Sequence, residues 1–386
     1  MINNQLYKSL EKQLISKLNR FPIVNRDLLE LKKAFKNKVL LITGAAGSIG
    51  SQFSQDILKY NLEPSKIIYL DKDENSLTEL NRELLLYKNF RNINTEFICS
   101  DLTSIDLDKI LKTNYVQFYL NFAAIKHVRS EENLESIKYM LNTNSIKFLP
   151  SNLNYLEKIF SVSTDKTVNP SSILGVTKYL MEINLNQFAK KSFFISSARF
   201  ANVAFSNGSI LKYIVDRLCQ KKNFGVPAKI KRFFITHSEA SSLCFKSLLK
   251  RNNHKIIIPN PKMLKRDILI IDLAKKIVKK FKFYPKFYSN FKIKNNYSNK
   301  ICYILLTKLS DGQKYSEEFF YKNEKIIEDI DPSICKVEFP NLRQKVNRIL
   351  KKIINLNNID YLKKYLIKNL KYYNPPKKII KISKHL

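Results

Sequence analysis

Three of the seven glycines in this 386-residue chain lie within seven positions of one another, in TGAAGSIGS (43–51). An average chain of this length holds about 27 glycines, so the cluster marks backbone that tolerates no side chain. It follows the apolar run KVLLITG (38–44) and precedes SQFSQDILKYN (51–61), which has a helical pattern. The order of strand, glycine turn and helix predicts the beginning of a βαβ unit.

Each glycine of this turn has its own use in a dinucleotide-binding site. Gly44 permits the tight reversal after the strand, Gly47 lets the backbone approach a pyrophosphate, and Gly50 lets the helix pack closely on the strand. The beginning of the helix offers free N–H groups to the phosphates. The residues expected to bind the cofactor here are Gly44, Ala46, Gly47, Ser48, Ile49 and Gly50.

Asp71 ends the second apolar strand, KIIYLD (66–71), about twenty residues after the glycine turn. A carboxylate at this place accepts hydrogen bonds from the adenosine ribose hydroxyls and opposes a 2′-phosphate, so it favours NAD over NADP. Lys72 beside it weakens that discrimination, and a turn aspartate or helix cap is the alternative interpretation. Other residues expected beside the cofactor follow the later strands: Asp101, Leu102, Ala123, Ala124 and Ser163.

Strands alternate with helices up to about residue 205, and the alternation then becomes less regular. This order predicts an α/β fold with a Rossmann-type, doubly wound parallel sheet. We expect four regions: an N-terminal helical appendage (1–37), an NAD-binding Rossmann domain (38–210), a smaller substrate lobe partly interleaved with the sheet (211–340) and a basic helical tail (341–386).

The composition excludes several classes of protein. Hydrophobic residues at 44% and charged residues at 26% are globular values. No apolar run approaches the roughly 18 residues of a membrane-spanning helix, and the N-terminus lacks the apolar core of a signal peptide. The five cysteines include no CxxC pair, which suits free thiols in a reducing compartment. We therefore expect a soluble, cytoplasmic protein without a metal site.

The chain carries 68 Lys and Arg against 33 Asp and Glu, a net charge of +35. Such a charge suggests nucleic acid or anionic lipid. The lysines are spread along the sequence, however, which indicates compositional drift, so we expect no nucleic-acid partner. Residues 341–386 hold thirteen Lys and Arg against one Asp, and this tail is the part suited to peripheral contact with an anionic membrane.

Chemically capable side chains gather in SVSTDKTVNPSSILGVTK (161–178). Thr164, Asp165 and Lys166 follow a predicted strand, at the end of an open α/β sheet where ligands bind. Lys178 comes twelve residues later on the next helix, where its charge can lower the pKa of a nearby hydroxyl. The alternative interpretation is a capped helix start with solvated lysines.

The chain resembles the extended short-chain dehydrogenase/reductase superfamily and, more narrowly, the CapD-like polysaccharide biosynthesis family typified by UDP-N-acetylglucosamine 4,6-dehydratase. The resemblance runs over roughly residues 18–376. Its matching pieces, in family order, are NRFPIV (19–24), TGAAGSIGS, LDKDENSL (70–77), NFAAIKHV (121–128), STDKTVNPSSILGVTK (163–178), RFANVAFSNGSI (199–210), KRFFIT (231–236), DGQKYSEEFF (311–320) and NLKYYNPP (369–376).

The resemblance implies a homo-oligomeric enzyme that uses NAD and a UDP-sugar. The sugar loses a hydride from C4 to NAD, a base removes the C5 proton, the C6 hydroxyl leaves as water, and the hydride returns to C6. In this scheme Thr164 contacts the 4-hydroxyl, Asp165 is the acid at C6, Lys166 is the C5 base, and Lys178 orients the nicotinamide ribose. The expected sugar-nucleotide contacts are Lys126, His127, Asn202, Ser209 and Arg232, although a core or surface role for His127 is the alternative.

Two departures from the family pattern stand out. Leu174 replaces the tyrosine of the superfamily's YxxxK motif, as methionine does in membrane-anchored relatives. Ser310 and Asp311 stand where relatives carry Arg-Pro before Gly-Glu-Lys, so Arg232, with Lys308, would have to hold more of the diphosphate. An epimerase or ketoreductase of the same scaffold, or a degenerate sugar-nucleotide binder without activity, are the competing interpretations.

Overall fold

The computed structural model describes residues 4–127, 131–151, 155–187, 193–264, 267–288, 300–309, 312–340, 343–370 and 372–375. In these residues nine strands form one sheet in the order β15-β16-β11-β6-β5-β4-β1-β2-β3. Its strands are β1 (Val39–Thr43), β2 (Lys66–Asp71), β3 (Asn94–Cys99), β4 (Phe118–Asn121), β5 (Lys158–Thr164), β6 (Phe194–Phe200), β11 (Lys255–Pro259), β15 (Ile327–Glu328) and β16 (Ile334–Glu338).

The strands from β3 to β11 pair in parallel, and β16 joins β11 in antiparallel register. The strand order reverses at β1, which lies between β2 and β4. At such a reversal the connections leave in opposite directions and open a crevice at the carboxyl ends of the strands. The glycine turn follows β1, so it lies at this crevice.

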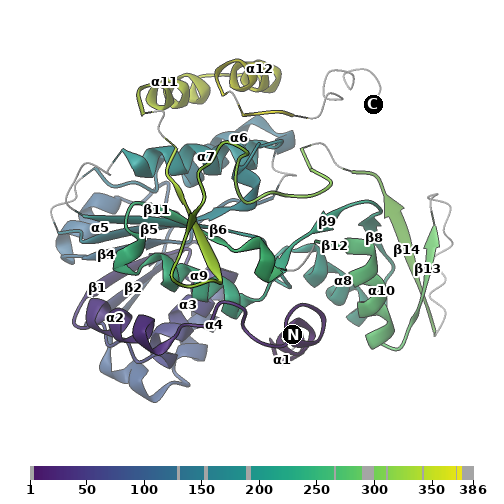
Figure 1. The fold of residues 1–386 in the computed structure, drawn as a ribbon, viewed down its shortest axis with the longest axis horizontal. Helices are drawn as coiled ribbons and strands as arrows, with labels where there is room; N and C mark the ends of the chain where they lie inside the picture. The colour runs from purple at the N-terminus through teal and green to yellow at the C-terminus, as the bar shows by residue number, and fades with distance from the viewer. Residues whose placement is uncertain are drawn as a thin grey trace.

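Helices cover both faces of the sheet because its central strands are apolar on both sides. Figure 1 shows α6 (Leu134–Leu141) and α7 (Ile173–Asn186) on one face, and α3 (Ser48–Lys59) and α9 (His237–Ser247) on the other. Two further helices of this region are α4 (Glu74–Leu84) and α5 (Leu107–Thr113).

A smaller lobe lies at one end of the sheet and has its own apolar core (Figure 1). Its helices α1 (Asn4–Leu14), α8 (Ile210–Cys219) and α10 (Ile270–Lys280) pack with a parallel sheet in the order β13-β14-β8. The strands of this lobe and of its junction with the large sheet are β7 (Asn202–Val203), β8 (Phe224–Pro227), β9 (Lys231–Arg232), β10 (Phe234–Ile235), β12 (Ile268–Leu269), β13 (Tyr284–Tyr288) and β14 (Ile301–Thr307).

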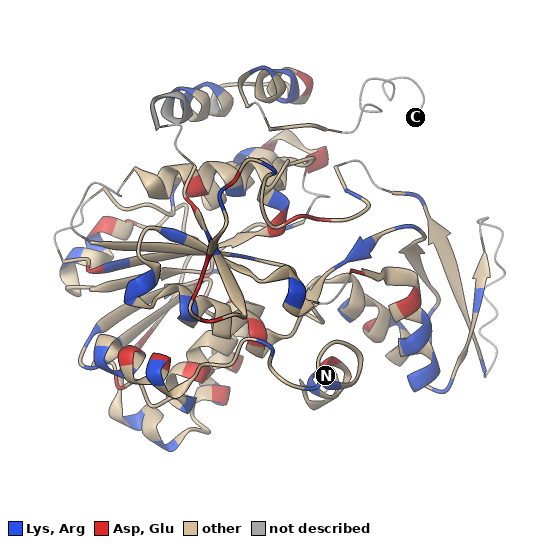
Figure 2. Ribbon diagram, viewed as in Figure 1, with Lys and Arg blue, Asp and Glu red and all other residues tan. Residues whose placement is uncertain are grey.

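The basic tail forms α11 (Arg343–Ile354) and α12 (Ile359–Asn369), which pack on α7 through an apolar cluster. Residues 376–386 lie outside the described residues. Figure 2 shows Lys and Arg on the tail, on the small lobe and among the sheet helices. Across the described parts of the chain, none of the helices combines the length and apolarity needed to cross a membrane. The predicted peripheral membrane contact and the homo-oligomer stay predictions.

Two N-terminal contacts bind the appendage to α9. Arg20 donates to Glu239 from Nε at 2.7 Å and from Nη2 at 2.8 Å, and Asn19 donates to Ser242 at 2.8 Å. The NRFPIV segment therefore lies along α9, on the face of the sheet opposite α7.

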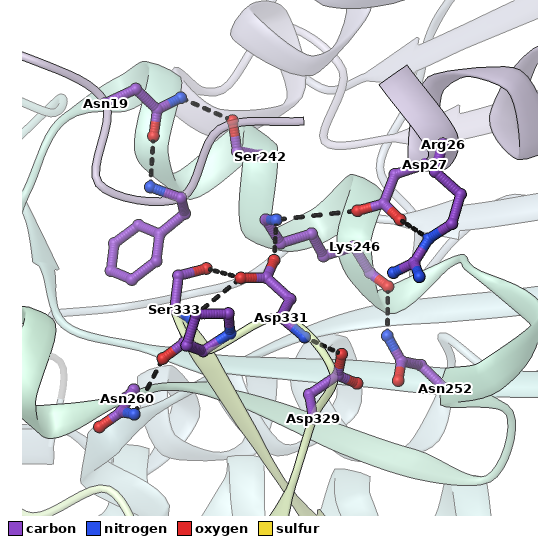
Figure 3. Close-up of polar contacts among 12 residues, drawn as sticks. Asn19, Arg26, Asp27, Ser242, Lys246, Asn252, Asn260, Asp329, Asp331 and Ser333 are labelled. Carbon is purple, nitrogen blue, oxygen red and sulfur yellow. Dashed lines mark hydrogen bonds and ion pairs between the residues drawn. The ribbon is translucent and has the colours of Figure 1, made fainter. Parts of the chain in front are cut away.

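A buried ionic cluster holds α2 (Asn25–Phe35) beside the last strands of the sheet (Figure 3). Lys246 of α9 has no exposed surface and lies between Asp27, 3.9 Å away, and Asp331. Arg251 also pairs with Asp27, at 2.8 Å, and with Asp329, at 3.2 Å. Because a buried charge is stable only when it is paired, these contacts fix the segment before β16 against α9.

Candidate functional site

The glycine turn fits tightly against the strand that follows α5. Gly44 has φ +66°, and a Cβ on it would lie 2.4 Å from the backbone nitrogen of Ala123. A Cβ on Gly50 would lie 2.3 Å from the carbonyl oxygen of Gly44. Strand β4 ends at Asn121, so Ala123 lies in the loop that follows it.

Helix α3 begins at Ser48, directly after Gly47, and no described side chain caps it. Its first N–H groups are consequently available to an anion. The hydroxyl of Ser48 accepts a hydrogen bond from the nitrogen of Asn207 at 2.9 Å, which brings a second loop to the turn. Ala46 and Ile49 complete the turn.

Asp71 fixes the glycine turn. Its Oδ2 accepts a hydrogen bond from the nitrogen of Ala46 at 3.0 Å, and its Oδ1 accepts one from Asp73 at 3.2 Å. Burial raises the pKa of the Asp71 carboxyl. Each carboxylate oxygen has two acceptor sites, so Asp71 can also accept from a ribose hydroxyl.

Lys72 is engaged away from Asp71. Its amine donates to the hydroxyl of Tyr139 at 3.1 Å, and that hydroxyl donates to Asp101. Asp101 also accepts from the hydroxyl of Thr103 at 2.7 Å, while Leu102 is buried. Tyr139 of α6 was not foreseen, because nothing in the sequence links this helix to the ends of β2 and β3.

The Thr-Asp-Lys run forms a compact polar group at the carboxyl end of β5, whose last residue is Thr164. The hydroxyl of Thr164 donates to Oδ1 of Asp165 at 2.9 Å, and Nζ of Lys166 lies 2.9 Å from the same oxygen. Lys166 also donates to Asn202 at 3.3 Å. Asp165 is fully buried, and its Oδ2 has no hydrogen-bond partner among the described residues. A buried carboxylate oxygen without a partner indicates a place for a water or a ligand.

Lys178 is buried, and its amine donates to the carbonyl of Val162 at 2.9 Å. Burial lowers the pKa of Lys178 to about 7. The hydroxyl of Ser163 donates to Glu182 at 2.6 Å, and its predicted place beside the cofactor stays a prediction. Leu174 is buried in α7 and brings no hydroxyl to the site.

An unforeseen ion network supports this region. Arg199 of β6 and Glu182 of α7 have no exposed side-chain surface and pair through two hydrogen bonds of 2.7 Å. Arg199 also pairs with Glu324 at 2.9 Å. The sequence carries a signal for this network, because Glu182 lies inside the apolar helix sequence 173–185 and Arg199 lies inside an apolar strand. Each charge requires a partner when it is buried.

The loop after β4 is held by Asn144, which lies in a short π-helix (Asn142–Ile146) after α6. The amide of Asn144 bonds to both the nitrogen and the carbonyl of Ile125, at 2.9 Å each. Farther along this loop, Lys126 and His127 are exposed. The His127 ring passes so close to Gly208, which has φ +71°, that a Cβ there would lie 2.5 Å from the ring.

Arg232 and Ser209 have structural partners in the small lobe. Ser209 caps α8, its hydroxyl accepting from Lys212 at 3.3 Å. Arg232 is buried, and its Nη1 donates to the carbonyls of Lys314 at 3.0 Å and Tyr315 at 3.3 Å. Arg232 therefore anchors the segment that follows the missing family arginine. Ser310 and Asp311 lie outside the described residues, and Lys308 is exposed.

The segment anchored by Arg232 also carries Glu317, which sequence reasoning missed. Its buried carboxylate lies 3.5 Å from Arg232 and 3.8 Å from Lys314. Over the parts of the chain that the structure covers, no His, Cys, Asp and Glu side chains gather in a group able to hold a metal.

A glycine turn at the reversal of a parallel sheet, with titratable residues after β5, defines a Rossmann-type α/β protein. Residues 40–338 match the polysaccharide biosynthesis protein family, and the chain belongs to this family. The predicted family and fold class are thus confirmed.

Among its relatives are the capsular polysaccharide biosynthesis protein CapD of Staphylococcus aureus and an inverting UDP-N-acetylglucosamine 4,6-dehydratase of Campylobacter jejuni. The chain is 28% identical to the first over 302 residues, covering 72% of this chain and 47% of that protein. It is 26% identical to the second over 233 residues, covering 58% of this chain and 67% of that protein. The chain thus spans about half the length of CapD.

Solved structures show the same fold at low sequence identity. Pen from Bacillus thuringiensis has a TM-score of 0.63 at 19% identity, with 80% of this chain and 89% of that chain covered. A UDP-N-acetylglucosamine 4-epimerase from Methanobrevibacter ruminantium has a TM-score of 0.57 at 16% identity, with 86% and 99% covered.

Proposed function

We propose that this chain is an NAD-dependent nucleotide-sugar 4,6-dehydratase that converts UDP-N-acetylglucosamine, or a similar UDP-sugar, to its 4-keto-6-deoxy product for surface polysaccharide biosynthesis in the cytoplasm. The observation that carries this proposal is the ion pair between Asp165 and Lys166. It lies at the carboxyl end of β5 and leaves one buried carboxylate oxygen that has no hydrogen-bond partner in the part of the chain that the structure describes.

The residues around the glycine turn fit NAD. The uncapped beginning of α3 suits a pyrophosphate, and Asp71 suits a ribose diol. A structural neighbour, the UDP-glucuronic acid 4-epimerase of Bacillus cereus, was solved with UDP-glucuronic acid and NAD, at a TM-score of 0.55 and 18% identity. When bound, NAD supplies a hydride acceptor for C4 of the sugar and later a hydride donor for C6.

The side chains after β5 would then move the protons. Thr164, whose hydroxyl donates to Asp165, can take the proton of the 4-hydroxyl and pass one to Asp165. Lys166 in its neutral form removes the C5 proton, which the 4-keto group acidifies. Asp165 returns its proton to the C6 hydroxyl, which leaves as water, and Lys166 finally reprotonates C5. The sugar loses one water, and each residue recovers its starting form.

The other predicted residues would serve around this centre. Lys178 would orient the nicotinamide ribose, while Lys126, His127 and Asn202 would face the sugar. Ser209 and Arg232 would contribute by holding neighbouring backbone, and Ser163 by holding the side chain of Glu182.

An epimerase or ketoreductase of the same scaffold is the second candidate, and a sugar-nucleotide binder without activity is the third. Neither epimerisation at C4 nor reduction of a keto group needs a base at C5. Lys166 beside Asp165 favours dehydration, whereas Leu174, at the position where the superfamily carries a tyrosine hydroxyl, is the feature that supports the third candidate.

The test is to incubate the protein with UDP-N-acetylglucosamine and NAD and to follow the sugar by NMR. Dehydration gives a 4-keto-6-deoxy sugar with a new C6 methyl signal. A C4 epimer with its C6 hydroxyl intact would show the second candidate to be correct, and binding without turnover would support the third. A preparation of the Lys166→Ala variant controls for contaminating enzymes.

A further inference from the structure

Tyr139 joins two charged side chains at the carboxyl ends of β2 and β3. It lies half-buried in α6, and its hydroxyl donates to Oδ2 of Asp101. The same hydroxyl accepts from the amine of Lys72 at 3.1 Å, and that amine lies over the Tyr139 ring, 5.0 Å from its centre. One aromatic side chain therefore holds Lys72 through both its hydroxyl and its ring face.

Asp101 is itself fixed in place. Its Oδ1 accepts from the backbone nitrogen of Thr103 at 2.8 Å and from the Thr103 hydroxyl at 2.7 Å. Because one carboxylate oxygen is bound in this turn, the other is directed at Tyr139. The position of the Tyr139 hydroxyl, and with it the place of the Lys72 amine, is consequently set by the loop after β3.

This arrangement bears on the choice between NAD and NADP. Lys72 directly follows Asp71, whose carboxylate accepts from the nitrogen of Ala46 in the glycine turn and is the group that we propose to bind the adenosine ribose. NADP differs from NAD by a phosphate on that ribose, and a lysine amine is a strong partner for a phosphate. On the sequence alone, Lys72 is expected to weaken the exclusion of NADP. The structure places its amine against Tyr139.

The charges around Lys72 point the same way. The hydrogen bond to Tyr139 raises the pKa of Lys72, so its amine is a cation at neutral pH. The carboxylate of Asp101, on the other side of the Tyr139 hydroxyl, offsets that positive charge. A 2′-phosphate would have to draw Lys72 away from these partners, and otherwise it would meet the like charge of Asp71.

We propose that Tyr139 is a specificity-determining residue of the cofactor site, which holds Lys72 away from the adenosine ribose and so lets Asp71 exclude NADP. This inference rests on the proposed NAD-dependent function and deepens it. A phenylalanine at position 139 would keep the ring and remove the hydroxyl that joins Lys72 to Asp101.

The test measures, by calorimetry, the affinities of the full chain, freed of bound nucleotide, for NAD and for NADP. The wild type should bind NAD more tightly. In Tyr139→Phe the amine of Lys72 can turn to a 2′-phosphate, so NADP affinity should rise by about three- to tenfold, while NAD affinity changes by less than about twofold. Adding Lys72→Met to this variant should return the ratio of the two affinities to its wild-type value.

Tyr115 provides the matched control. It is an exposed tyrosine that precedes β4, so it lies at the amino ends of the strands, on the opposite edge of the sheet from the glycine turn. Tyr115→Phe removes one hydroxyl, as Tyr139→Phe does, and should leave the ratio of the two affinities unchanged.

The outcomes separate the two proposals. A wild-type protein that binds neither nucleotide would overturn the proposed function itself. A wild-type protein that binds NAD, with the same affinity ratio in Tyr139→Phe, would overturn the role of Tyr139 alone. Equal losses of affinity for both nucleotides would also reject that role, because they assign Tyr139 to supporting the loop after β3.

Two further results would count against the role of Tyr139. A wild-type preference for NADP would show that Lys72 is free to bind a phosphate. A gain for NADP that persists when Lys72 is also replaced would show that the gain has another source. Far-UV circular dichroism and the thermal midpoint establish that each variant is folded.

Discussion

The guanidinium of Arg199 and the carboxylate of Glu182 face each other in the core with two hydrogen bonds of 2.7 Å. Removing one partner of a fully buried pair leaves the other charged and desolvated. We therefore expect Arg199→Met to lower the free energy of unfolding by about 3–5 kcal/mol, as measured by urea denaturation. The exposed pair of Arg82 and Glu79 is the control, and Arg82→Met should cost less than about 1 kcal/mol. Equal costs for the two variants would contradict the prediction.

The buried amine of Lys178 should make the free energy of unfolding depend on pH. Its pKa is lowered to about 7 by burial, against 10.5 for an ordinary lysine. Between these two values the unfolded chain binds more protons than the folded one, so this group makes stability rise with pH. Urea denaturation of the cofactor-free protein at pH 7 and pH 9.5 should show a smaller rise in Lys178→Met than in the wild type. An equal rise would mean that the amine is charged in the folded protein.

We expect Gly44→Ala to weaken cofactor binding, because the glycine turn leaves no room for a side chain at this position. The added methyl would meet the backbone of Ala123 at 2.4 Å, and the residue has φ +66°. Strain of this kind costs about 1–3 kcal/mol, so NAD affinity measured by calorimetry should fall by about 5- to 150-fold. Gly225→Ala in the small lobe is the control, because its nearest neighbour is a side-chain methyl of Thr307 at 3.1 Å. Unchanged NAD affinity in Gly44→Ala would place the cofactor elsewhere.

Lys166→Ala tests the proposed C5 base. Loss of a general base lowers kcat by about 10²–10⁴-fold, whereas binding of the UDP-sugar should change little. Deuterium from D₂O should enter C5 of the product in the wild type and fail to enter sugar incubated with the variant. The exposed Lys322 supplies the control variant Lys322→Ala. Undiminished turnover in Lys166→Ala would remove the basis of the dehydratase proposal.

Local sequence was sufficient for the elements that depend on short-range chemistry. The glycine turn, Asp71 and the alternating strands and helices follow from backbone sterics and hydrophobic pattern within a few residues of one another. The Thr-Asp-Lys run could also be placed, because the carboxyl ends of parallel strands meet at one edge of the sheet.

Contacts between distant segments could not be read in this way. Asn144 holds Ile125 from a π-helix, Tyr139 reaches Asp101 from α6, and Ser163 donates to Glu182 of α7. These choices depend on which side chains are desolvated together, and a one-dimensional pattern does not contain that information.

The sequence alone determined the kind of fold, the turn suited to a dinucleotide and the residues that follow β5. Only the tertiary structure decided what surrounds Lys166. It brought Lys314 to the carbonyl of Val168, two residues after Lys166, across 146 residues of chain, and it fixed Arg232 to the backbone of Lys314. The physical reason is that a buried charge is set by its neighbours in space, which are fixed when the whole chain has packed.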